Sequence, residues 1–171
     1  MQVEVSIQDI YFESEPASES PISDETWQSW FSCWLEHLQP ELTVTGAYEL
    51  CLRLTDDAEI QSLNAQYRQK DQPTDVLAFA ALEVEAPFVD HEVEIPLYLG
   101  DIVISVETAR SQAQQEGHSL QQELAWLSAH GLLHLLGWDH PDDSSLMAML
   151  SMQETLLRSV GLSTQYLTEK T

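Results

Sequence analysis

The segment 119–136 is apolar nearly all the way round when it is drawn as a helix. Its leucines lie on every side rather than along one stripe, a pattern typical of a helix buried at the centre of a domain. Ser119 and Gln122 form a capping box at its start, and Gly137 is suited to a left-handed turn at its end. We therefore predict a central helix around which the rest of the chain packs.

Three histidines lie on this helix or just beyond it, at positions 130, 134 and 140. His130 and His134 are one turn apart, about 6 Å along the axis and about 40° around it, so both imidazoles can reach one ion. Gly137 allows the chain to reverse, and His140 can then supply a third nitrogen. Three imidazoles with an open fourth position are typical of catalytic zinc. The alternative is that these are ordinary core or surface histidines. We predict one Zn2+ per chain, because three imidazoles grouped on a buried helix need polar partners.

The spacing of these histidines is also that of the metzincin proteases. Those enzymes carry a glutamate directly after the first histidine, where it acts as the general base. Gly131 occupies that position here. A zinc metallopeptidase, or another metal hydrolase with metzincin-like spacing, remains a hypothesis, and Gly131 is the residue that argues against a protease.

Composition excludes several other classes of protein. Hydrophobic residues make up 43% of the 171-residue chain, so this is not a disordered acidic protein. The two cysteines, Cys33 and Cys51, form no metal-binding pair and fit a reducing compartment. The first residues lack a signal-peptide pattern, and no apolar run approaches the roughly 18 residues that span a bilayer. We expect a cytoplasmic protein without a membrane partner.

Alternating and helical patterns of apolar residues predict a mixed fold. We expect strands at residues 2–8, 47–54, 76–80 and 97–106, and helices at 24–39, 55–69, 107–116, 119–136 and 143–159. Residues 13–23 and 83–96 are predicted loops, and residues 162–171 a flexible tail. The elements do not alternate strictly. We therefore predict an α+β fold, with one metal-dependent hydrolase domain over residues 1–171, a mixed sheet of about four strands, flanking helices and a metal-binding cleft.

The helix expected at residues 24–39 carries large apolar side chains at helical spacing. They are Trp27, Trp30, Phe31, Trp34, Leu35 and Leu38. Such a stripe can form a partner-binding face or pack into the core. The strict periodicity favours the core.

Three passages of the sequence have a specific order and spacing. They are NAQYRQKDQPTDVLAFA at residues 64–80, LGDIVIS at 99–105 and HGLLHLLGWDH at 130–140. Together they resemble the YbeY family of bacterial rRNA maturation factors, which are single-domain metal-dependent endoribonucleases. The resemblance extends over most of the chain after its first 45 or so residues. Ala78 departs from the pattern, because the family usually has serine there.

The resemblance implies a function and a set of site residues. It implies a zinc-dependent endoribonuclease, specific for single strands, that matures the 3′ end of small-subunit rRNA and acts in ribosome quality control. His130, His134 and His140 would be the zinc ligands, and Arg68 would be the family's functional arginine. The implied partners are rRNA and the small ribosomal subunit, with ribosomal proteins or an assembly GTPase, and no DNA.

Other polar residues near these passages suit roles in the reaction. Arg68 can bind phosphate through two parallel hydrogen bonds, although a residue at a helix end is often simply exposed. Asp75 and Asp101 could orient a ligand histidine or only shape turns. Glu123, seven residues before His130, could act as a base, orient a ligand histidine, or simply lie on the helix surface. We expect His118 to be an exposed loop residue.

The net charge of −23 would be expected to repel nucleic acid. The distribution modifies this, since residues 1–52 contain ten acidic residues and no Lys or Arg, whereas Arg53, Arg68 and Lys70 are close in sequence. We predict that Arg53 and Lys70 contact RNA, and that binding to RNA alone is weak and only slightly salt-dependent. A non-catalytic ribosome assembly factor with a structural metal is the third hypothesis.

Overall fold

The computed structural model describes residues 1–14, 20–43, 46–81 and 96–162. The strands are β1 (Gln2–Asp9), β2 (Ala47–Thr55), β3 (Val76–Ala80) and β4 (Leu97–Ser105). The helices are α1 (Ile10–Ser14), α2 (Asp24–Leu38), α3 (Asp57–Arg68), α4 (Val106–Glu116), α5 (Leu120–Leu135) and α6 (Asp143–Ser159). None of these helices is long and apolar enough to cross a membrane.

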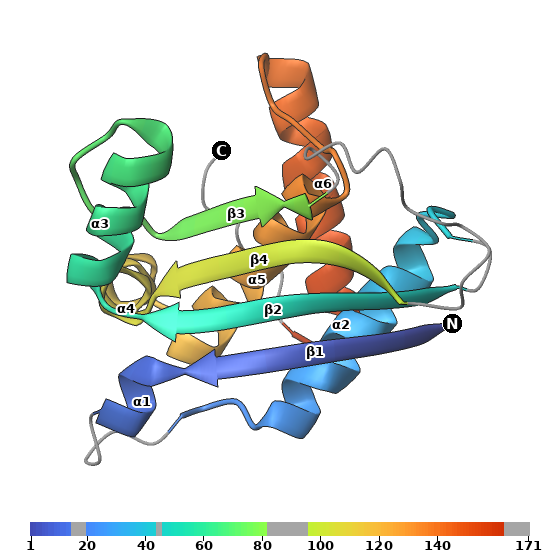
Figure 1. Cartoon of the computed structure of the whole chain (residues 1–171), viewed down its shortest axis with the longest axis horizontal. Coiled ribbons are helices and arrows are strands. Elements are labelled where there is room, and N and C mark those ends of the chain that lie inside the picture. The colour runs from blue at the N-terminus through green and yellow to red at the C-terminus, as the bar shows by residue number, and fades with distance from the viewer. Residues whose placement is uncertain (15–19, 44–45, 82–95, 163–171) are drawn as a thin grey trace.

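The four strands form one mixed sheet in the order β1-β2-β4-β3 (Figure 1). β2 pairs in parallel with both β1 and β4, and β3 runs antiparallel to β4 at the edge. The predicted α+β fold with a mixed sheet of about four strands and flanking helices is therefore confirmed.

The two faces of the sheet differ because side chains alternate along each strand. Leu52 of β2 pairs with Ile102 of β4, and both are fully buried beneath the helices. α5 packs against β3 and β4, α2 packs against β1, and α6 packs against α5. In Figure 1 these three helices lie behind the sheet, so this is its covered face. Arg53 and Val103, the next paired residues, point to the opposite face, which we call the open face.

The aromatic residues of α2 form part of the core, as predicted. Trp27, Phe31 and Trp34 are fully buried, and Trp30 is 7% exposed. The indole of Trp34 also donates a hydrogen bond to the carbonyl of Leu156 on α6, at 2.9 Å. The stripe therefore joins α2 to α6 and to the sheet and is not a free binding face.

Several predicted boundaries change in detail. α3 is capped by Asp56, whose carboxylate accepts from the backbone of Glu59, so the helix begins later than predicted. Residues 10–14 form the short helix α1, which includes two residues of the predicted loop 13–23. Residues 15–19 of that loop, residues 83–95 of the second loop and residues 163–171 of the tail lie outside the described residues.

Candidate metal centre

The C-terminal end of α5 is closed by a tight turn at Gly137. This residue has a φ of +95°, a conformation that favours glycine. The amide of Gly137 donates to the carbonyl of His134 at 3.0 Å, and the amide of Trp138 donates to Leu133 at 2.9 Å. This pair of bonds is the Schellman motif of helix ends. The turn sends the chain back toward α5, as predicted, and carries His140 with it.

The turn brings His130, His134 and His140 together. The Nε2 atoms of His130 and His134 are 3.0 Å apart. The ring of His140 lies 5.8 Å from the ring of His130 and 5.4 Å from that of His134, measured between centroids. Each residue offers one nitrogen to a group whose atoms all lie within 4.8 Å of one another. The spacing suits three ligands of a single metal ion.

In two of these rings, the nitrogen that points away from the other histidines, which we call the outer nitrogen, has a protein partner. The inner nitrogen is the one that faces the other histidines. Nδ1 of His130 lies 3.1 Å from Oε1 of Gln153, and His134 has a hydrogen bond with the backbone of Trp138. Burial lowers the pKa of both histidines from the usual value, and for His130 the bond to Gln153 and the charge of Asp75 partly oppose that effect. Both rings are therefore neutral at pH 7, and neutral imidazole is the form that binds metals.

The donor set fits a metal ion on chemical grounds. Two neutral imidazoles whose outer nitrogens are engaged present their inner nitrogens to each other at 3.0 Å. Two lone pairs at that separation repel unless a proton or a cation lies between them. Three nitrogen ligands suit zinc, and also nickel, copper and iron.

Asp75 lies on the side of the histidines. It precedes β3, and its carboxylate accepts from the backbone of Val76 at 2.7 Å and from the amide of Gln112 at 3.3 Å. Its negative charge acts on His130 and raises the pKa of that imidazole. Among Asp75, Asp101 and Glu123, the three carboxylates proposed for the site, Asp75 is the one whose charge changes the pKa of His130.

Arg68 is the last residue of α3, and its side chain is exposed. Gln69 ends the helix in the left-handed conformation, with a φ of +58°. The buried amide of Asn64 then donates to the carbonyl of Gln72 at 2.9 Å and holds the loop that leads to Asp75. Among the described residues, Arg68 has neither a hydrogen bond nor an ion pair, so its guanidinium is free to bind a ligand. Lys70, in the same loop, is also exposed.

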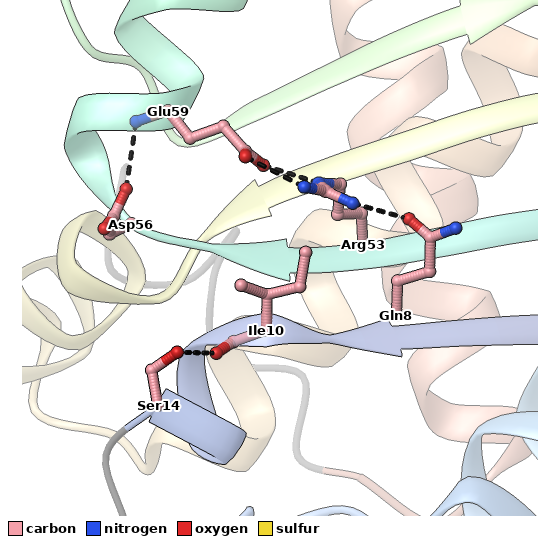
Figure 2. Close-up of polar contacts among 6 residues, drawn as sticks. All are labelled: Gln8, Ile10, Ser14, Arg53, Asp56 and Glu59. Carbon is pink, nitrogen blue, oxygen red and sulfur yellow. Dashed lines mark hydrogen bonds and ion pairs between the residues drawn. The ribbon is translucent and has the colours of Figure 1, made fainter.

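Arg53 lies on the open face and is already engaged. Figure 2 shows its guanidinium against the carboxylate of Glu59, with N–O distances of 2.5 and 2.8 Å, and a further bond of 2.8 Å to Gln8. Arg53, Glu59 and Asp101 line a groove on this face, and the carboxylate of Asp101 accepts a hydrogen bond from the hydroxyl of Tyr98. Because α5 packs on the covered face, the structure does not bring Arg53 or Asp101 to the histidines.

Glu123 and His118 form a buried pair in the first turn of α5. Nε2 of His118 lies 2.5 Å from the Glu123 carboxylate, and the two side chains are only 12% and 5% exposed. His118 does lie in the loop between α4 and α5, but the expectation that it is exposed is wrong, and Glu123 is not on the surface. The amide of His118 donates to the carbonyl of Ala113 at the end of α4, at 3.1 Å, while its imidazole reaches Glu123 on α5.

Gln153 also contacts one of the histidines, His130, and is not among the residues predicted from the sequence. It is 1% exposed, and it lies on α6 in line with the buried residues Met149 and Leu156. A polar residue on the apolar stripe of a predicted helix is the signal that could have found it, since a buried amide needs partners.

Gly131 has no room for a side chain. A Cβ atom there would lie 2.8 Å from Cγ2 of Ile102, which is on the sheet. Gly131 thus lets α5 approach β4 closely, and its position faces the sheet rather than the histidines. The position where metzincins carry their catalytic glutamate is closed in this chain.

Comparison with known proteins gives a consistent result. The model of the family described as Endoribonuclease YbeY matches residues 13–161. A protein of that name from Nostoc sp. (strain PCC 7120) is 57% identical over 170 residues, covering 95% of this chain and 92% of the relative. Another, from Cyanothece sp. (strain PCC 7425), is 59% identical over 162 residues, covering 95% of both chains.

One solved structure is also similar. The solution structure of TM1509 from Thermotoga maritima has a TM-score of 0.55 and 23% sequence identity, covering 93% of this chain and 89% of that one. At this identity the likeness concerns the fold.

Proposed function

We propose, because this chain belongs to the Endoribonuclease YbeY family, that it is a zinc-dependent endoribonuclease of rRNA maturation. Its substrate is single-stranded rRNA, in particular the 3′ end of small-subunit rRNA, and its role includes ribosome quality control. The protein acts in the cytoplasm. The observation that carries the proposal is the group of three histidines whose nitrogens lie within 4.8 Å of one another.

His130, His134 and His140 would hold one Zn2+ ion per chain. When bound, such an ion would act as a Lewis acid and lower the pKa of its water to about 7. The chain supplies neutral imidazoles, because burial keeps His130 and His134 unprotonated at pH 7. Asp75 lies within electrostatic reach of His130 and is our candidate for orienting a reactant or accepting its proton.

Arg68 is the residue that we assign to the phosphate of the substrate. Its guanidinium is exposed, and hydrogen bonds from a guanidinium stabilise charge that develops on phosphate oxygens. Lys70 follows in the same exposed loop and extends the positive charge toward the RNA backbone. Arg53 is a weaker RNA contact, because its charge is neutralised by Glu59.

A net charge of −23 makes tight binding to naked RNA unfavourable. We therefore propose that the small ribosomal subunit, with ribosomal proteins or an assembly GTPase, delivers the RNA end to the site. Few phosphates would be contacted, so the affinity for free RNA should depend only weakly on salt.

The test measures metal content and RNA cleavage on untagged protein. Wild-type protein should contain about one zinc per chain and cut a small-subunit rRNA precursor in its single-stranded part. His130→Ala should lose both the metal and cleavage, because the ligand set is broken. His37→Ala, which changes an exposed histidine on α2, is the matched control and should change neither.

Three outcomes separate the hypotheses. Cleavage at the wild-type rate by metal-free protein would contradict the proposed mechanism. Cutting of unstructured peptides would favour a metallopeptidase, which the closed position at Gly131 argues against. Loss of the fold in His140→Ala, with no RNA cleavage by the wild type, would favour an assembly factor with a structural metal.

A further inference from the structure

The buried amide of Gln153 has two partners on α5. Its Oε1 atom lies 3.1 Å from Nδ1 of His130, and its Nε2 atom lies 3.3 Å from the backbone carbonyl of Trp126. Gln153 is 1% exposed, so neither amide atom is hydrated by bulk water. The side chain therefore joins α6 to the histidine-bearing segment of α5 through polar contacts inside the core.

The partner on one side decides the orientation of the amide. A backbone carbonyl only accepts hydrogen bonds, so the atom facing Trp126 must be the NH2 group of Gln153. The oxygen then faces His130. Because an amide oxygen only accepts, the Nδ1 atom of His130 must carry the proton.

We propose that Gln153 is a positioning residue that holds His130 in the Nδ1–H tautomer, with the lone pair of Nε2 directed at His134 and His140. The inference rests on the proposed function, in which these three histidines bind the metal. It adds α6 to α5 and the turn after it as a part of the site. α6 contributes no ligand, but it fixes the ring and the tautomer of His130, the most buried of the three histidines.

Gln153 orients a ring that the neighbouring backbone of α5 cannot orient. His134 has a backbone hydrogen bond to Trp138, within the turn that ends α5, so its ring is oriented by its own segment. His130 lies in the middle of α5, where the backbone groups are occupied by the helix. Only another element can hold its outer nitrogen, and α6 supplies Gln153 from 23 residues further along the chain.

The first measurement is metal affinity, by chelator competition with Zn2+ and Co2+ on the full untagged chain. Gln153→Met has a similar volume and removes the acceptor, and we expect a dissociation constant about 10 to 100 times larger. Gln153→Glu keeps an acceptor for Nδ1–H and should stay within about fivefold of the wild type. Met149→Leu, a buried change one turn earlier on α6, is the packing control and should bind as the wild type does.

The second measurement is the tautomer of His130 in metal-free protein, from long-range 1H–15N spectra near pH 8. We expect protonation at Nδ1 in the wild type and in Gln153→Glu, and a population protonated at Nε2 in Gln153→Met. A purely structural role for Gln153 would weaken folding without moving this signal. The tautomer reading needs neither metal nor RNA.

Two results would overturn the inference. One is a folded Gln153→Met protein that binds both metals within twofold of the wild type. The other is wild-type His130 protonated at Nε2, a reading that decides the matter even if Gln153→Met does not fold. Failure of the proposed function looks different, because it would appear as wild-type protein that binds metal but leaves RNA intact, with the tautomer of His130 unchanged.

Discussion

On the covered face of the sheet three histidines meet at the C-terminal end of α5, whereas on the open face the polar side chains of Gln8, Arg53 and Asp101 are distributed along β1, β2 and β4. On the open face Arg53 pairs with Glu59, and Asp101 accepts a hydrogen bond from Tyr98. At the end of α5 the histidines are held from outside, by Gln153 and by the backbone of Trp138.

The two faces therefore differ in their remaining capacity to bind a ligand. Groups that satisfy one another, as on the open face, have little left to offer a ligand, and such partly exposed ion pairs contribute only about 0 to 1 kcal/mol. Imidazoles whose outer nitrogens are engaged keep their inner lone pairs for an ion. In a chain with six basic residues, the positive charge of a bound ion would then act where the protein's own cations are scarce.

The largest expected effect is on the rate of RNA cleavage, and it should separate Arg68 from Arg53. Arg68→Ala should lower the single-turnover rate of RNA cleavage about 100- to 1000-fold, because a free guanidinium that stabilises developing charge is lost. Arg53→Ala, the same change on the open face, should lower it less than tenfold, since that guanidinium is already bound to Glu59.

Equal losses of rate in the two arginine variants would contradict this prediction and indicate that RNA crosses the open face. Zinc content and circular dichroism of both variants serve as the control, because neither residue contacts the histidines. Arg68→Lys should recover part of the rate, since it restores the charge without the two parallel hydrogen bonds.

Much of the candidate site depends on local sequence and could be predicted from it. The four-residue spacing of His130 and His134 fixes their relative direction on any helix, and Gly137 marks the turn that returns His140. The central position of α5 followed from its apolar surface, and ten of its residues besides Glu123 are indeed buried.

What could not be predicted depends on contacts between distant elements. Gln153 reaches His130 only because α6 packs on α5, and no local pattern gives that register. The burial of Glu123 depends on His118, which lies in the preceding loop and contacts its carboxylate. For Asp101 a signal existed, since it alternates with the apolar Ile102 and so must face the other side of the strand from α5.

The second prediction concerns pH and the covered face. In metal-free protein the folded-state pKa values of His130 and His134 lie below the unfolded value of about 6.5. The unfolded chain therefore binds protons first as the pH falls, and the free energy of unfolding should decrease from about pH 7 to pH 5.5, by at most about 1.4 kcal/mol per pH unit for each histidine.

Urea unfolding of metal-free protein across this range measures the effect. The double variant His130→Gln/His134→Gln should show a smaller decrease, because two of the proton-binding groups are gone. Saturating Zn2+ should steepen the dependence, since protons then compete with the ion for the same nitrogens. If the free energy of unfolding depends on pH equally in the double variant, the groups that are neutral in the folded protein and protonate on unfolding are not these two imidazoles.

The smallest effect belongs to the open face. A double-mutant cycle with Arg53→Met and Glu59→Gln should give a coupling of about 0.2 to 1 kcal/mol, because both side chains are about one-third exposed and solvent screens the pair. Arg53 lowers the pKa of Glu59, so this stabilisation is present above about pH 4.5 and is lost as the pH falls through the lower folded-state value. The two faces should therefore lose stability in separate pH windows, and 0.5 M salt should weaken only the pair on the open face. A coupling above about 2 kcal/mol would show that Arg53 and Glu59 are a rigid structural element and that the open face is as tightly organised as the metal centre.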